Sequence, residues 1–208
     1  MYYLGIDLGG TNIAAGLVDE NFNIVHKDSI PTNAKGRDDR AIVKDITYIC
    51  KKILNDTNTD VSEVKWIGVG SPGTCDIENG IVVYANNISF RNTPIRKWIQ
   101  EEINIPVYIN NDANCAALGE AYAGATKDAS DSIMITIGTG LGGGIIINKK
   151  IYSGFNGSGG ELGHSIIVLD GEKCTCGRKG CWEAYGSATA LKSQTSRSEE
   201  RFSRNAET

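Results

Sequence analysis

The chain has 208 residues, 40% of them hydrophobic, and a formal net charge of -4. This length can bury one large or two modest cores. The acidic balance excludes a general nucleic-acid binder, and no apolar run is long enough to cross a bilayer, so neither kind of partner is expected. Since the first residues lack a basic region and a cleavage site, we expect no secretory leader and a cytoplasmic location.

The N-terminal part of the chain predicts strands first and then an alternation of helix and strand. Short apolar runs predict strands at residues 2–8, 12–18, 22–28 and 66–70. Apolar residues at helical spacing predict a helix over 38–55, and later segments predict a strand at 80–84 and a helix over 94–103. This alternation indicates an α/β layer.

Two glycine turns stand between apolar strands, the first at Gly9-Gly10-Thr11 and the second within residues 138–144. Each turn can present backbone N–H groups to a phosphate, although a plain turn in a sheet explains either one alone. Their similar hairpins favour an internally duplicated fold that grips phosphates from two sides. Asp7, just before the first turn, is suited to hold Mg²⁺ through water.

A polar run, NNDAN, follows the strand expected at 106–109 and precedes a helix expected over 113–124. Asp112 in this run lies at the carboxyl end of a strand, where α/β folds place their chemistry. It is equally suited to be the N-cap of the following helix, and both roles are compatible. Further strands are expected at 132–137, 145–147 and 165–169, and a helix over 183–191.

One His and three Cys near the C-terminal end form a compact set of metal ligands: His164, Cys174, Cys176 and Cys181. Four such ligands suit a closed tetrahedral zinc site. In a chain without a secretory leader, clustered thiolates indicate a metal before a disulfide. The alternatives are reduced cysteines in a loop, or a nucleic-acid-binding ribbon, which the acidic composition disfavours. Cys50, Cys75 and Cys115 are scattered and are interpreted as small buried hydrophobes.

Taken together, GIDLGGT at the start, Ser-Pro-Gly at 71–73, NNDAN at 110–114, TIGTGLGGGI at 136–145, GELGH at 160–164 and CTCGRKGCWE at 174–183 resemble the ROK family of sugar kinases. The resemblance extends from Met1 to about residue 193. It implies an α/β, actin-like fold of two ribonuclease-H-like domains around a cleft. The expected domains are residues 1–112 and an incomplete second domain at 113–196, and the resemblance also implies a homodimer.

The resemblance implies ATP-dependent phosphorylation of a hexose 6-hydroxyl, with glucose the expected substrate and Asp112 the general base. Hexose contacts are expected from Gly73, Asn86, Asn87, Asn111, Asp112, Glu161, His164 and Glu183. Contacts to ATP and its Mg²⁺ are expected from Asp7, Gly9, Gly10, Thr11, Asn12, Gly138, Thr139, Gly140 and Gly142. Structural Zn²⁺ on His164 and the three cysteines would hold the loop that carries the sugar contacts.

The alternatives within the family are an N-acetylmannosamine or N-acetylglucosamine kinase and a sugar-sensing repressor that binds without catalysis. The repressor needs an N-terminal helix-turn-helix, whereas a strand is expected from residue 2. The family continues beyond this chain, so we expect a truncation that removes part of the nucleotide site. Residues 197–208 fit the in-frame translation of a sequencing adapter beginning AGATCGGAAGAG, and we expect this tail to be non-native.

Overall fold

The computed structural model describes residues 1–85 and 87–206, and its main feature is a five-stranded sheet with the order β3-β2-β1-β4-β8. Its strands are β1 (Tyr2–Leu8), β2 (Asn12–Asp19), β3 (Ile24–Pro31), β4 (Val64–Ser71) and β8 (Val107–Asn111). The first three are antiparallel neighbours, whereas β1, β4 and β8 run parallel. The parallel strands therefore end at one edge of the sheet, beside Asp7, Ser71 and Asn111.

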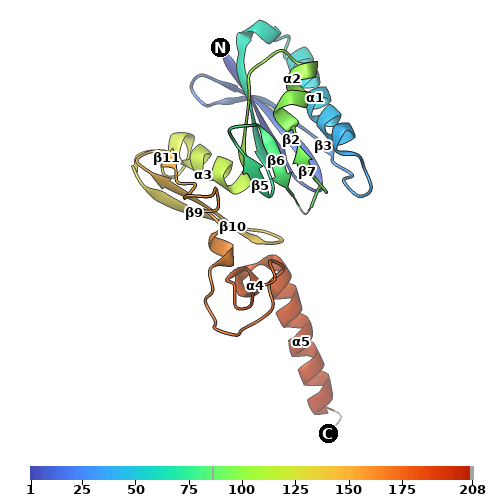
Figure 1. Ribbon diagram of the computed structural model, residues 1–208, viewed down its shortest axis with the longest axis vertical. Helices are drawn as coiled ribbons and strands as arrows, with labels where there is room; N and C mark the ends of the chain where they lie inside the picture. The colour runs from blue at the N-terminus through green and yellow to red at the C-terminus, as the bar shows by residue number, and fades with distance from the viewer. Residues whose placement is uncertain (86, 207–208) are drawn as a thin grey trace.

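Two helices, α1 (Asp39–Asp56) and α2 (Ile95–Glu102), lie beside this sheet (Figure 1). Residues of α1 at helical spacing, among them Ile42, Ile46, Ile49 and Ile53, are fully buried in one core shared with the sheet. This packing confirms the expected helix, because its apolar stripe faces strands whose alternate residues are also apolar. A 3-10 turn, η1 (Val61–Glu63), precedes β4.

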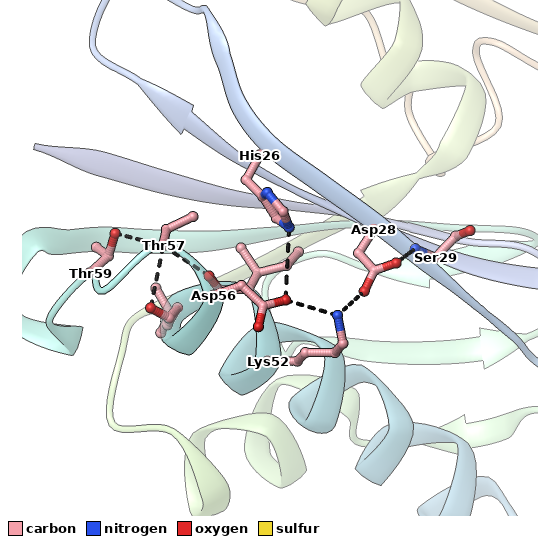
Figure 2. A network of polar contacts seen from close by, with 9 residues as sticks. His26, Asp28, Ser29, Lys52, Asp56, Thr57 and Thr59 are labelled. Atoms are coloured by element: carbon pink, nitrogen blue, oxygen red, sulfur yellow. Dashed lines mark hydrogen bonds and ion pairs between the residues drawn. The ribbon is translucent and has the colours of Figure 1, made fainter.

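A polar contact network fastens α1 to β3 at the surface (Figure 2). Lys52 Nζ donates to Asp28 Oδ2 at 2.6 Å and to Asp56 Oδ2 at 2.8 Å. The bond to Asp28 is the largest cause of the raised pKa of Lys52, and the bond to Asp56 is the next. Because these side chains are 29–39% exposed, the network contributes little to the stability of the fold.

A small antiparallel sheet of β5 (Thr74–Asp76), β6 (Ile81–Tyr84) and β7 (Arg91–Thr93) follows β4 in the chain. Only β6 was expected from the sequence, because strands of three residues give no readable alternation. The small sheet carries Gly73 and Asn87 near its ends and so brings them toward the end of β8.

A third sheet, with the order β11-β10-β9, consists of β9 (Ser132–Ile137), β10 (Leu141–Ile147) and β11 (Lys150–Ile151). Helix α3 (Asp112–Ala123) packs on one of its faces. An added Cβ at Gly144 would lie 2.5 Å from Ala117 Cβ, so glycine is needed for this close approach. On the other face Ile133 and Ile137 are 65% and 70% exposed.

The C-terminal region is mostly loop, with η2 (Leu162–His164), α4 (Glu183–Gly186) and α5 (Ala188–Ala206), which extends away from the rest of the molecule (Figure 1). The expected strand at 165–169 is wrong, because only Ile166 forms an isolated bridge, to Cys181, and residues 166–169 are exposed. The expected helix at 183–191 is broken at Ser187, whose backbone is extended at φ -85° and ψ 164°.

Two smaller differences concern the turns. The strand expected at 22–28 begins later, at Ile24, because Phe22 adopts a left-handed φ of 64° in the turn. Cys75 and Cys115 are half-buried rather than buried, while Cys50 is buried as expected. Among the described residues, no helix combines the length and apolar composition needed to cross a membrane. That residues 197–208 are a non-native tail remains a prediction. Residues 207–208 lie outside the described residues.

Candidate active site

Most of the expected hexose contacts line one cavity of about 440 Å³, a size typical of small-molecule sites. The expected residues that line it are Gly73, Asn87, Asn111, Asp112, Glu161, His164 and Glu183. They come from the junction of β8 and α3, from the turns before β5 and after β6, and from η2 and α4 with the residue before η2, which are far apart in the sequence. Asn86, also expected here, lies outside the described residues.

Asp112 is the first residue of α3 and lines this cavity. The N-cap is Asn111, not Asp112, because Asn111 Oδ1 accepts hydrogen bonds from the backbone N–H groups of Ala113 and Asn114 at 3.0 and 3.2 Å. Burial raises the pKa of Asp112, and the negative charge of Asp7 raises it further. A carboxylate with a raised pKa is a stronger base than an ordinary Asp, as general-base catalysis requires.

Gly73 lies between the end of β4 and the start of the small sheet. Its φ is 84°, and an added Cβ would lie 2.0 Å from the carbonyl oxygen of Tyr84, so no other residue fits without movement. Its carbonyl oxygen accepts a hydrogen bond from Asn111 Nδ2 at 3.2 Å. Asn111 therefore caps α3 and fixes Gly73 at the same time.

The expected nucleotide contacts divide into two groups. Gly138, Thr139, Gly140 and Gly142 line the same cavity as the hexose contacts. Gly10 and Thr11 instead line a separate hollow, with Asn87 shared between the two, and Gly9 N donates to Asn12 O at 2.9 Å to close that turn. Asp7 and Asp112 line a further hollow of about 400 Å³. Carboxylate oxygens are ligands that Mg²⁺ prefers, so Asp7 is placed where it could hold this ion.

The four expected metal ligands converge. The ligand atoms of His164, Cys174, Cys176 and Cys181 all lie within 4.8 Å of one another. Cys174 Sγ is 3.6 Å from His164 Nδ1, and Cys176 Sγ is 3.6 Å from Cys181 Sγ, spacings that fit the edges of a tetrahedron with zinc–ligand bonds of about 2.0–2.3 Å.

Two thiols of this cluster differ in charge state, because burial raises the pKa of Cys181 to about 11 whereas Cys176 is acidic. Hydrogen bonding by the backbone N–H and then the side chain of Arg178 contributes to lowering the pKa of Cys176 to about 6, so this ligand is a thiolate at neutral pH. The donor set therefore fits zinc.

Several cavity residues were not assigned from the sequence, including Cys75, Asn110, Asn114 and Thr136. Asn114 is 5% exposed; its Nδ2 donates to Asn110 Oδ1 at 3.2 Å, while its Oδ1 has no partner among the described residues. The signal for both Asn residues was their place in the NNDAN run, beside Asp112.

The family model for "ROK family" matches residues 3–206. A glucokinase from Halalkalibacterium halodurans is 39% identical over 191 residues, which cover 91% of this chain and 58% of that protein. A xylose repressor from Caldicellulosiruptor bescii is 36% identical over 189 residues, covering 90% of this chain and 47% of the repressor. The chain thus spans about half the length of the curated relatives it matches.

The fold is also that of solved family members. A ROK hexokinase from Thermus thermophilus superposes with a TM-score of 0.84 at 33% identity, over 96% of this chain and 65% of that one. A ROK glucokinase from Streptomyces griseus, in complex with glucose and AMPPNP, gives 0.77 at 40% identity, over 92% and 59%. The expected α/β, actin-like fold is confirmed, and the chain belongs to the ROK family.

Proposed function

We propose that this chain is part of an ATP-dependent hexose kinase that phosphorylates the 6-hydroxyl of glucose. The observation that supports it most is the single cavity in which Asp112 lies with Glu161, His164, Glu183 and the 138–140 turn. A base, hydrogen-bonding groups for a sugar and a glycine turn for a phosphate are the parts that phosphoryl transfer needs.

In this proposal Asp112 accepts the proton of the 6-hydroxyl as its oxygen attacks the γ-phosphate. Asn111, Glu161 and Glu183 orient the sugar by hydrogen bonds to its other hydroxyls. Asp7 would hold Mg²⁺ through water, and charge on the phosphates would be neutralised there. His164 and the three cysteines hold structural zinc; since Nδ1 faces the Cys174 sulfur, Nε2 is left for the sugar. A thiolate site of this kind needs reduced cysteines, so we place the protein in the cytoplasm. The resemblance to the family further suggests that the full-length protein is a homodimer.

The test is hexose-dependent ADP release by two proteins, the 208-residue chain and the product of the whole gene recovered from its source DNA. Each is assayed with glucose, N-acetylglucosamine and N-acetylmannosamine. We expect turnover with glucose in the whole-gene product. Turnover with an N-acetylhexosamine instead would replace glucose by that sugar as the proposed substrate. The source DNA also shows whether residues 197–208 have the adapter codons.

A second candidate is a sugar sensor without catalysis, which the similarity to the xylose repressor favours. The sensor proposal would replace the kinase proposal if a folded whole-gene product binds glucose but turns over none of the sugars.

A further inference from the structure

The turn at residues 138–140 is held from outside the third sheet by one short segment, residues 183–189, which we name the strap. Leu141 N donates to Glu183 Oε2 at 2.9 Å, next to the turn. Ala188 N donates to Gly138 O at 2.9 Å, and Thr189 Oγ1 donates to Thr139 O at 2.7 Å. Three consecutive peptide groups of the turn region are therefore fixed by residues about 50 positions later in the chain.

These bonds orient the turn. Because a trans peptide is planar, its N–H points opposite to its C=O. Binding of the Gly138 and Thr139 carbonyl oxygens by the strap therefore directs the N–H groups of Thr139 and Gly140 to the opposite side of the turn. Consecutive N–H groups that point the same way form an anion-binding concavity.

The other end of the strap is tied to the metal-ligand cluster. The strap begins two residues after Cys181, and the carboxylate of Glu183 faces both sites. Its Oε1 lies 3.7 Å from Cys174 Sγ and accepts a hydrogen bond from Thr175 Oγ1 at 3.3 Å, whereas its Oε2 accepts from Leu141 N. Trp182 N also donates to Ser165 O at 2.9 Å, which links the backbone next to His164 with the backbone next to Cys181.

The break in the helix at Ser187 makes the hydrogen bond from Ala188 to the turn possible. A continuous helix over 183–191 would use the N–H of Ala188 internally, whereas the extended Ser187 frees it for Gly138 O. Ser187 Oγ then caps the next helix by accepting from Ala190 N at 3.1 Å.

From these contacts we propose that the strap couples the Cys₃His metal site to the phosphate turn. Thr189 is a positioning residue, and Glu183 links the two sites in addition to its proposed contact with the sugar. Metal binding orders the strap, and the strap aims the N–H groups of the turn at the nucleotide phosphates. The inference rests on the proposed function for its ligand, but the coupling itself is a property of the 208-residue chain.

The first test is hydrogen–deuterium exchange by mass spectrometry on the zinc-loaded chain, before and after removal of zinc with a chelator. We expect peptides that contain Leu141 or Ala188, whose N–H groups donate to Glu183 and to Gly138, to exchange roughly three- to tenfold faster without zinc, the effect of losing about one hydrogen bond. Peptides from α1 serve as the internal control and should not change. Unchanged exchange of the Leu141 and Ala188 amides, in a chain shown by metal analysis to have lost its zinc, would overturn the coupling.

The second test changes the strap and leaves the metal ligands intact. Thr189→Val removes the hydroxyl that donates to Thr139 O, and we expect the looser strap to show as faster exchange of the Leu141 and Ala188 amides with full zinc content. Thr189→Ser keeps the hydroxyl and should keep exchange slow. Thr195→Val, which removes an exposed hydroxyl that donates to Leu191 O in the same helix, is the matched control. If Thr189→Val and wild type exchange alike, Thr189 does not position the turn.

The third test reads function in the whole-gene product. Thr189→Val should raise KM for ATP several-fold while KM for the hexose stays within about twofold, a split that a general loss of folding does not produce. Equal increases in both KM values would contradict the positioning role. If the whole-gene product shows no kinase activity but exchange of the Leu141 and Ala188 amides still depends on zinc, the coupling stands and the kinase proposal fails.

Discussion

Asp112 is a residue whose ionisation opposes folding, since burial raises its pKa above the ordinary value of 3.8. The folded protein therefore binds this proton more tightly than the unfolded chain does. The carboxylate costs stability at pH values above its folded pKa, and the cost is absent below pH 3.8, where both states are protonated. Such a cost is common at active sites, where function rather than stability selects the residue.

The substitution Asp112→Asn should separate the role of Asp112 in turnover from its cost in stability. We expect turnover in the whole-gene product to fall by about 10²- to 10⁴-fold, the contribution of a general base. The melting temperature at pH 7 should rise, because Asn can still accept from Ala113 N without a buried charge, and the difference should vanish near pH 3. Asp128→Asn, at an exposed site, should leave both unchanged; a lower melting temperature for Asp112→Asn at pH 7 would contradict the burial argument.

At the scale of elements, the junction between β4 and the small sheet depends on a glycine. Gly73→Ala forces a side chain into a left-handed φ and against the Tyr84 backbone. We expect a lower melting temperature and at least tenfold weaker glucose binding by calorimetry, because Asn111 loses the carbonyl it holds. Gly68→Ala is the matched control: an added Cβ there has nothing within 4 Å, so both quantities should stay near wild type.

The elements that the sequence predicted correctly are those with long periodic patterns. The strand at 2–8 has alternation and the helix over 38–55 has helical spacing that the observed burial follows. The strand at 132–137 was predicted from its apolar composition, although Ile133 and Ile137 remain exposed. The apolar run at 166–169 misled the prediction, since its side chains stay exposed beside the Cys loop. The strands β5, β7 and β11 are too short to show a pattern at all.

For the site, motifs predicted which residues meet but not how they are held. Asn111 and Asp112 are both good N-caps by residue type, and only the geometry assigns the cap to Asn111. The strap could not be predicted, because Ala188 and Thr189 bind backbone carbonyl oxygens, and such contacts leave no side-chain signature in a partner turn made of glycines.

At the scale of the whole molecule, β9 forms an exposed edge within the part of the chain that the structure describes. Ile133 and Ile137 lie on this strand and are largely exposed. Unpaired edges with apolar side chains favour association between molecules.

We therefore expect the 208-residue chain to self-associate with rising concentration, and Ile133→Lys to reduce this association, as measured by light scattering. Tyr48→Lys provides a control, since Tyr48 is 58% exposed but lies on α1. Equal scattering by Ile133→Lys and wild type would show that β9 is not the surface that associates.

The four candidate metal ligands also close a long loop of the chain, and closing a loop costs conformational entropy. His164 and Cys181 bound an 18-residue segment without a long helix or strand of its own. Bringing the ends of a flexible segment of that length together costs roughly 2.5 kcal/mol of chain entropy. An ion that binds these ends offsets that entropy, so the segment acts as a loop closed by its ligands rather than by a hydrophobic core. We therefore expect the order of this segment to rise with the concentration of free zinc.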